Sequence, residues 1–318
     1  MPILDMPLEE LRAYRGRNEC PEDLDAFWDR GLSEIEACRS SARLVPAAFQ
    51  VPGAECFDLL FTGTGNASLH AHYVRPKGKG VYPAVLHFHG YSGACMDFSQ
   101  MLGWVTAGFC IASLDCRGQG GSSEDPIPVK GNTLQGHIIR GLDDCPDKLY
   151  YRSVFLDTAL LARIVMDFPE VDAARVGAYG GSQGGGLTLA CAALTPSLNR
   201  AAPMMPFLCD YRRVWEMDLA KDAYVELQQY FRHSDPQHTH ETEIFTRLGY
   251  IDNINLAHRI RARVLMFTGL MDNICPPSTQ FAAYNRINSP KSMRIYPDFA
   301  HEYYPESDNE VMQFMLKM

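Results

Sequence analysis

The stretch Gly180-Gly181-Ser182-Gln183-Gly184 constrains the fold more than any other. It places the pattern G-x-S-x-G between a strand-like segment and a helix-like segment. Residues 175–179 before it form a short apolar run typical of a buried strand, and residues 184–194 after it predict a helix. A serine in such a sharp turn has a strained backbone that only small neighbours tolerate. The hydroxyl of Ser182 then stands at the edge of a sheet, above a helix N-terminus that favours negative charge.

The five-residue pattern alone would also fit an ordinary glycine turn, since the chain has 25 glycines. A nucleophilic serine needs a base and an acid, which α/β-hydrolases place in the order Ser, Asp or Glu, His. Asp272 and His301 follow that order, each on a loop just after a strand-like segment. The alternatives are a helix N-cap for Asp272 and a solvated loop residue for His301. Asp298 and Glu302 are rival acids near the base, ranked below Asp272.

These residue types predict catalysis by an activated serine. A serine hydroxyl is a poor nucleophile at neutral pH, so His301 would accept its proton during attack on a carbonyl and later protonate the leaving alcohol. Asp272 would hold the imidazole in the required tautomer. The backbone N–H groups of Gln183, after the nucleophile, and of Tyr91, after the strand-like run 84–89, are the expected oxyanion donors.

Two groups of histidines are candidate metal ligands. His87 and His89 are two residues apart and would share one face of a strand, but no third ligand with suitable spacing lies nearby. His233, His238 and His240 are separated by polar residues, which predicts a surface loop. We therefore expect no metal and no cofactor.

The order of predicted elements indicates an α/β-hydrolase fold, with a mainly parallel central sheet and helices on both faces. Strands are expected at 84–89, 109–114, 175–179, 201–205, 264–269 and 293–296, helices at 21–38, 98–107, 150–167, 184–194 and 278–287, and an antiparallel hairpin at 56–61 and 68–74. We expect one domain over 1–318, with an N-terminal helical extension (about 1–45) and a helical insertion over the site (about 210–258). Residues 122–149 are expected to be mostly loop.

Composition excludes several classes of function. A chain of 318 residues can bury the core of one large domain, and its net charge of −9 argues against a nucleic-acid partner. No run approaches the about 20 apolar residues of a membrane span, and the first residues do not resemble a signal peptide. The ten cysteines include no C-x-x-C pair, which favours reduced thiols and a cytoplasmic location. Cys275 is expected near the site, without a role as nucleophile.

Three segments together, Arg117-Gly118-Gln119, Gly180-Gly181-Ser182-Gln183-Gly184 and His301-Glu302, resemble the signature of the acetyl xylan esterase and cephalosporin C deacetylase family, carbohydrate esterase family 7. The resemblance implies a serine esterase that removes acetyl groups from short acetylated xylo-oligosaccharides and from cephalosporin C. It assigns the nucleophile, acid and base to the same three residues. It also implies an intracellular homo-oligomer, typically a hexamer, with the hairpin near 57–74 as a candidate interface.

Arg117, Gln119 and Glu302 are expected to support the site rather than to react, since a guanidinium fork suits bracing of neighbouring loops. The alternative for Arg117 is a solvated residue in a glycine turn. Other α/β-hydrolase chemistry (peptidase, lipase or dienelactone hydrolase) and a non-catalytic binding protein on the same fold are the competing functions. A phosphate-binding loop at 180–186 is disfavoured because no lysine follows it.

Overall fold

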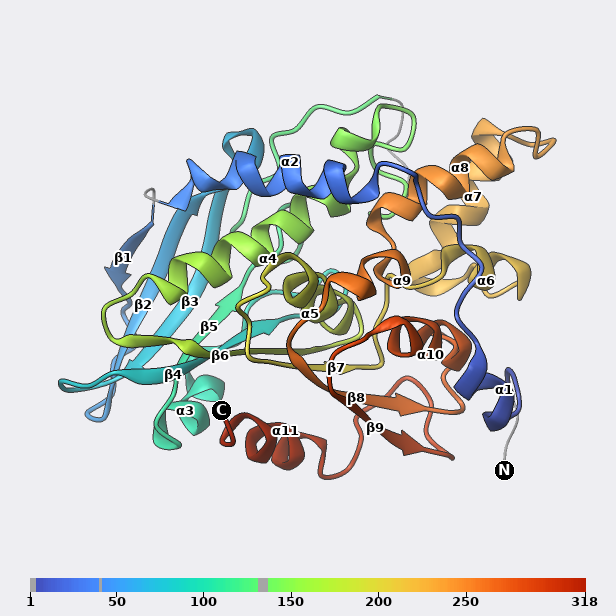
Figure 1. Cartoon of the computed structure of the whole chain (residues 1–318). Coiled ribbons are helices and arrows are strands. Elements are labelled where there is room, and N and C mark those ends of the chain that lie inside the picture. The colour runs from blue at the N-terminus through green and yellow to red at the C-terminus, as the bar shows by residue number, and fades with distance from the viewer. Residues whose placement is uncertain (1–3, 40–41, 131–136) are drawn as a thin grey trace.

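The computed structural model describes residues 4–39, 42–130 and 137–318. Within these residues nine strands form one sheet, in the order β1-β2-β3-β5-β4-β6-β7-β8-β9 (Figure 1). The strands are β1 (Arg43–Pro46), β2 (Ala54–Thr62), β3 (Ser68–Pro76), β4 (Tyr82–Phe88), β5 (Cys110–Leu114), β6 (Val171–Gly181), β7 (Arg200–Met204), β8 (Arg263–Gly269) and β9 (Lys291–Tyr296).

The expected α/β-hydrolase architecture is confirmed. From β5 to β9 every neighbouring pair is parallel, whereas β1, β2 and β3 pair antiparallel with one another and β3 pairs antiparallel with β5. All five residues of β5 are buried, as expected for a strand covered by helices on both faces. The predicted hairpin is β2 and β3, whose last pair is Thr62 with Ser68.

Helices cover both faces of this sheet (Figure 1). The helices α4 (Tyr150–Met166), α5 (Gln183–Leu194) and α10 (Pro277–Arg286) lie on one face, and α3 (Phe98–Thr106) and α11 (Ser307–Met315) lie on the other. A further layer, α2 (Leu24–Glu36), packs on α4 through a stripe of buried residues at helical spacing: Leu24, Phe27, Trp28, Gly31 and Ile35.

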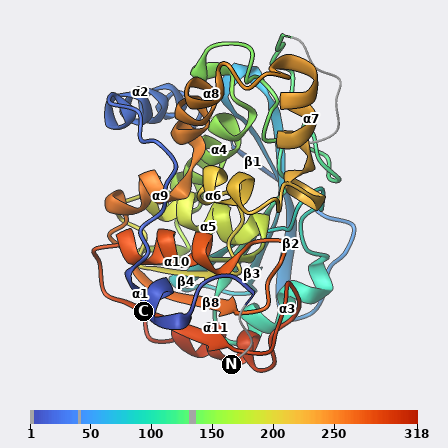
Figure 2. The ribbon, with the colours of Figure 1, turned by 90° about the vertical axis from the view of Figure 1, so that its right-hand side faces the viewer.

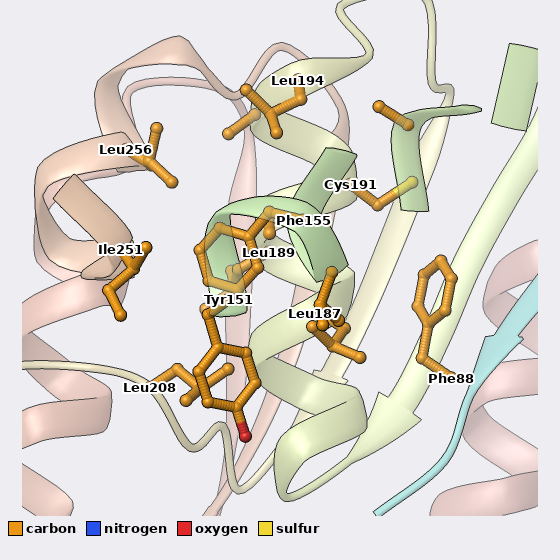
Figure 3. Close-up of a cluster of buried hydrophobic side chains, with 14 of the residues drawn as sticks. Phe88, Tyr151, Phe155, Leu187, Leu189, Cys191, Leu194, Leu208, Ile251 and Leu256 are labelled. Carbon is orange, nitrogen blue, oxygen red and sulfur yellow. The ribbon is translucent and has the colours of Figure 1, made fainter. Parts of the chain in front are cut away.

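The largest core cluster lies between the sheet, α4 and α5 (Figure 3). This cluster includes Tyr151 and Phe155 of α4, Leu187 of α5, and Phe88 at the end of β4. All twelve residues of α5 are buried. The helix behind Ser182 is therefore held from every side, which gives the turn before it a fixed position.

An insertion of short helices follows β7. It contains α6 (Tyr211–Glu216), α7 (Val225–Ser234), α8 (Glu241–Leu248) and α9 (Asn253–Leu256). Figure 1 shows α6, α7 and α8 together on the side toward which the arrows of β8 and β9 point, and Figure 2 shows α7 and α8 near one end of the molecule. The predicted surface loop is present at His238 and His240, which are exposed between α7 and α8. The prediction is wrong for His233, which is exposed but lies in the last turn of α7.

Three elements were not predicted from the sequence. They are α1 (Leu8–Ala13), β1 and α11. Helix α1 buries only Leu11, and the four residues of β1 are partly or fully exposed, so neither has a clear apolar pattern. Helix α11 buries Ser307, Val311 and Met315 among polar neighbours, which gives a weak stripe.

Part of the loop-rich segment predicted at 122–149, residues 131–136, lies outside the described residues. No helix among residues 4–39, 42–130 and 137–318 is both long enough and apolar enough to cross a membrane.

Candidate active site

Ser182 occupies the turn between β6 and α5, and its backbone is strained. Its φ of 57° and ψ of −119° lie outside the regions that non-glycine residues ordinarily adopt. Two hydrogen bonds fix this geometry: the Ser182 N–H donates to the carbonyl of Met204 at 3.0 Å, and the Ser182 carbonyl accepts from Phe207 N–H at 3.0 Å. The turn therefore presents the serine hydroxyl at the carboxyl end of the central strand, as predicted.

The glycines of the motif have different roles. A Cβ on Gly184 would lie 1.9 Å from the carbonyl oxygen of Phe88, and one on Gly180 would lie 2.5 Å from the same oxygen. A Cβ on Gly181 would meet nothing within 4 Å. Gly180 and Gly184 are therefore required because the turn packs against the end of β4, whereas Gly181 has room for a side chain.

The structure brings Ser182, His301 and Asp272 together in one hydrogen-bonded chain. The Nε2 atom of His301 lies 2.9 Å from the Ser182 Oγ, and its Nδ1 lies 2.8 Å from the Asp272 Oδ2. A carboxylate only accepts, so Nδ1 carries the proton and Nε2 is left to accept the serine proton. The imidazole side chain is 18% exposed, so a substrate can reach the hydroxyl beside it.

Asp272 is fully buried and its carboxylate is held on both oxygens. Oδ1 accepts the backbone N–H groups of Ile274 at 2.9 Å and Cys275 at 2.8 Å. Oδ2 accepts from the Gln280 side-chain amide at 3.1 Å as well as from His301. The alternative of a helix N-cap does not apply, because Pro276 occupies the N-cap of α10. This set of donors compensates burial of the charge and fixes the direction of the acid.

The two expected oxyanion donors lie on adjoining backbone segments. Gln183 is the first residue of α5, where a backbone N–H has no partner within the helix. The loop after β4 that carries Tyr91 reaches the same turn, since the Gln183 side-chain amide lies 3.4 Å from the carbonyls of His89 and Gly90. The loop after β4 and the first residue of α5 therefore lie in contact with each other.

The side chain of Tyr91 anchors the loop after β4. The ring packs edge-to-face on Phe207 at 5.8 Å between centroids. The hydroxyl donates to Glu226 at 3.3 Å and accepts from His137 N–H at 3.1 Å. The insertion helix α7, which carries Glu226, thus helps to fix the position of the loop after β4.

Arg117 is completely buried and braces the loop after β5. Its Nε and Nη2 donate to the two carboxylate oxygens of Asp157 at 2.7 and 2.6 Å, in the bidentate geometry that a guanidinium favours. Its Nη1 donates to the carbonyl of Thr64 at 3.2 Å. The alternative of a solvated arginine is therefore wrong in this structure, and the contacts join β5, α4 and the β2–β3 turn.

Gln119 and Gln183 connect the loop after β5, which contains Arg117, to the turn that carries Ser182. The Gln119 amide donates to the Gln183 side-chain oxygen at 2.9 Å, and that oxygen also accepts from the Tyr151 hydroxyl at 2.8 Å. The Gln119 oxygen accepts from Ser92 N–H at 2.9 Å. Gln119 therefore links the turn that carries Ser182 to the loop after β4.

The remaining acids and the thiol near His301 have secondary positions. Glu302 accepts from Ala300 N–H at 3.0 Å, a contact within the histidine loop, and Asp298 is exposed. Cys275 is buried beside Asp272, and burial raises the pKa of its thiol well above the ordinary range. A thiol kept protonated in this way is a poor nucleophile.

His87 and His89 make contacts within the sheet and with the loops next to it. His87 lies 2.8 Å from the Ser113 hydroxyl, and burial lowers its pKa to about 3, which keeps it neutral. His89 donates from Nδ1 to the Gly90 carbonyl at 2.7 Å and accepts Cys116 N–H on Nε2 at 3.0 Å. Both nitrogens of His89 are thereby used within the protein.

Three supporting residues were missed by sequence reasoning: Gln280, Asp157 and Glu226. Each of these residues lies in a helix, and its polar side chain is buried. The sequence offered one weak signal, a charged or polar residue within an otherwise apolar helix, which is clearest for Asp157 in α4.

Comparison with known proteins agrees with the geometry. The family model for acetyl xylan esterase (AXE1) matches residues 1–318. The structure of acetyl xylan esterase 1 from Thermoanaerobacterium sp. JW/SL YS485 is 54% identical, with a TM-score of 0.96 and 99% of both chains covered. Acetyl xylan esterase from Paenibacillus sp. R4 is 36% identical, with a TM-score of 0.92 over 98% of this chain and 99% of that one.

A curated relative, acetyl esterase Axe7A of Xylanibacter ruminicola, is 26% identical over 306 residues, which are 93% of this chain. This chain spans 66% of the length of that relative. With the family model matched along its whole length and a close likeness to two solved structures, the chain belongs to the acetyl xylan esterase family.

Proposed function

We propose that this protein is a serine carboxylesterase that removes acetyl groups from small acetylated substrates through an acyl-enzyme intermediate. The observation that carries the proposal is the hydrogen-bonded chain from Ser182 through His301 to Asp272, placed at a strained strand-to-helix turn. In this assignment Ser182 is the nucleophile, His301 the general base and acid, and Asp272 the group that orients the imidazole.

The reaction follows from these positions. His301 Nε2 takes the proton of Ser182 as Oγ attacks the acetyl carbonyl, and the carbonyl oxygen becomes an oxyanion. The N–H groups of Gln183 and Tyr91 donate to that oxyanion, and each such donor contributes about 3 kcal/mol. The imidazolium then protonates the leaving alcohol, and the acetyl group stays on Oγ. Water attacks the acetyl-serine with His301 again as base, which releases acetate and restores the serine.

The proposed acyl group is short. The ring of Tyr91 packed on Phe207 brings two aromatic side chains to the loops on either side of the catalytic turn. The proposal takes this pair as the wall of the acyl site; such a wall would limit the length of the acyl chain, so acetate esters should be the best substrates. The names of the relatives point the same way, since they are acetyl esterases.

Acetylated xylo-oligosaccharides and cephalosporin C are the proposed substrates. Release of acetate from each is the direct test, with the Ser182→Ala protein as the blank. Turnover of either by the wild type supports the proposal. If a simple acetate ester is hydrolysed but neither compound is, the catalytic assignment stands and the proposed substrates are wrong.

We also propose a homo-oligomer, with the hexamer as the specific state and the hairpin around residues 57–74 as an interface. The family resemblance supports this proposal. Size-exclusion chromatography with light scattering gives the mass of the particle in solution. A mass of six chains supports the hexamer, and the mass of one chain contradicts any oligomer.

A cytoplasmic location is proposed from the cysteines. Cys56, Cys110, Cys116, Cys191, Cys209 and Cys275 are buried thiols, and a reducing compartment keeps thiols in that state. Fractionation of the native cells tests it, because activity in the culture medium would contradict it.

We further propose that residues 1–318 act as one domain, with residues up to about 45 as an N-terminal extension and about 210–258 as an insertion that shapes access to the site. The support is a single large cluster of buried side chains that runs from Leu24 in α2 to Ile287 after α10. One cooperative unfolding transition is expected by calorimetry, and two separate transitions would contradict it.

A further inference from the structure

A second cluster of chemically active side chains lies on the β2–β3 hairpin, away from the elements that carry Ser182. It consists of Asp58 on β2 and of His70 and His72 on β3. Asp58 is the cross-strand partner of His72, and the two histidines are two residues apart, so all three side chains are on one face of the sheet. Their possible ligand atoms all lie within 4.8 Å of one another.

The hydrogen bonds of His72 determine which of its nitrogens carries the proton. Nδ1 lies 2.7 Å from the carbonyl oxygen of Met96, and a carbonyl only accepts, so Nδ1 is the donor. In the neutral ring Nε2 therefore presents a lone pair, and it lies 3.7 Å from the Oδ1 of Asp58. The ring stacks on Phe98 at 3.9 Å between centroids, which fixes this direction.

His70 is oriented in the same way by a carboxylate. Its Nδ1 lies 2.7 Å from the Oδ2 of Asp115, so this nitrogen is a donor as well. Its Nε2 lies 3.0 Å from the same Oδ1 of Asp58 that the His72 Nε2 faces. The Nε2 atoms of His70 and His72 thus both face the same oxygen of Asp58.

We propose that Asp58, His70 and His72 form a binding site for a divalent transition-metal ion of the zinc class. A single cation among the three atoms satisfies both lone pairs and the carboxylate at once. Neighbouring ligand atoms around tetrahedral zinc are about 3.3 Å apart, and the distances of 3.0 and 3.7 Å to Asp58 lie on either side of that value. The Asp58 side chain is 36% exposed, which leaves access for a water molecule as the fourth ligand.

The surroundings match those of known zinc sites. A ligating histidine commonly donates its other N–H to a carboxylate or a backbone carbonyl, and His70 and His72 do one each. Asp115 is itself held by the backbone N–H groups of Cys95 at 2.7 Å and Ser122 at 2.9 Å. An ion bound here would therefore tie the hairpin to the loops that follow β4 and β5.

This role is structural, because the ion would act by holding these loops and the hairpin together. The pattern His70-x-His72 has the same spacing as the pair His87 and His89 considered in the sequence. Here the third ligand, Asp58, comes from the neighbouring strand. Pairing between two strands cannot be inferred from the spacing of residues within one of them.

The test is zinc binding to the full-length protein after treatment with a chelator, measured by isothermal titration and by thermal unfolding with and without ZnCl2. Asp58→Asn and His72→Asn each remove one ligand, and Asp58 is partly exposed, so its variant keeps the fold. His258→Asn is the matched control. Its imidazole also contacts a backbone carbonyl, that of Asn255, and a carboxylate, that of Asp25 at 3.1 Å, but it belongs to none of the metal-binding clusters found among the described residues.

We expect the wild type and His258→Asn to bind about one zinc ion per chain and to unfold at a higher temperature with zinc. Each ligand variant should bind at least about tenfold more weakly and lose that shift. The proposal is overturned if the wild type shows no saturable binding. It is equally overturned if both ligand variants bind as tightly as the control. The first result would leave His70 as an imidazolium between Asp58 and Asp115.

Discussion

The Cα of Gly184 lies so close to the end of β4 that an added Cβ would stand 1.9 Å from the carbonyl oxygen of Phe88. Backbone cannot move aside as a flexible side chain can, so the contact couples two segments. One segment is the turn that carries Ser182, and the other is the loop after β4, which contains the proposed oxyanion donor Tyr91. The position of Ser182 relative to that loop therefore depends on the absence of a side chain at this residue.

Gly184→Ala should disrupt this packing and Gly181→Ala should be tolerated. A Cβ at Gly181 meets nothing within 4 Å. Both variants introduce the same alanine, so only the steric clash at Gly184 distinguishes them. We expect Gly184→Ala to lose most esterase activity and to lower the unfolding free energy by at least about 1–3 kcal/mol, the usual effect of overpacking. Urea unfolding and initial rates measure both, and similar behaviour of the two variants would contradict this view of the turn.

Asp272→Asn should lower kcat by about 10⁴-fold with little change in KM, because the amide no longer fixes the required tautomer of His301. Asp298→Asn, which changes an exposed acid in the same loop as the base, should keep near wild-type rates. Steady-state kinetics on an acetate ester compare them. A large loss in Asp298→Asn alone would move the role of acid to that residue.

Arg117→Met should destabilise the protein by about 3–5 kcal/mol, since it leaves the buried carboxylate of Asp157 without its partner. The double variant Arg117→Met/Asp157→Leu removes both charges and should recover much of that loss. Arg39→Met provides the surface comparison. Arg39 pairs with Asp167 at 2.7 Å, but the two side chains are 35% and 52% exposed, so the cost should stay below about 1 kcal/mol.

These three proteins can be compared by urea unfolding. If Arg117→Met costs no more than Arg39→Met, the bidentate pair does not brace the fold.

Stability should fall as the pH rises through the titration of Glu226. Burial raises the pKa of this carboxyl to about 8, although backbone N–H donors such as that of Ile138 act in the opposite direction. In the unfolded chain the same carboxyl loses its proton at about pH 4.3. Between this pH and about pH 8 the folded protein binds more protons than the unfolded chain, so the unfolding free energy decreases as the pH rises.

Glu226→Gln has no proton to lose and should therefore show a shallower decline. Between about pH 5 and about pH 8 the difference in unfolding free energy between the two proteins should change by at least about 1.4 kcal/mol. Buried Asp252, whose burial raises its pKa to about 7, contributes equally to both proteins. Parallel curves for the two proteins would show that Glu226 is ionised in the fold throughout this range.

The sequence contained enough to place Ser182, Asp272 and His301, because each lies just after a strand in a parallel sheet. Such loops meet at one edge, so three distant residues could be brought together without knowledge of any side-chain contact. Gly180 and Gly184 were also expected, although their cause, the carbonyl of Phe88, required the packing of β4 against the turn.

Gln280, Asp157 and Glu226 could not be predicted as supporting residues, because their partners are determined by tertiary packing. Gln280 contacts Asp272 across eight residues, Asp157 contacts Arg117 across 40, and Glu226 contacts Tyr91 across 135. None of these spacings corresponds to a local motif. The same reason explains β1 and α11, whose short or weakly apolar patterns become ordered against the sheet and the core.

The most direct test of the account is hydrolysis of p-nitrophenyl esters of increasing acyl length by the wild type and by Ser182→Ala. We expect rapid hydrolysis of the acetate by the wild type, a steady fall as the acyl chain lengthens, and no turnover by Ser182→Ala above the rate without enzyme. Hydrolysis by Ser182→Ala at the wild-type rate would contradict the assignment of the nucleophile. Equal rates for acetate and long-chain esters would contradict the preference for acetyl groups.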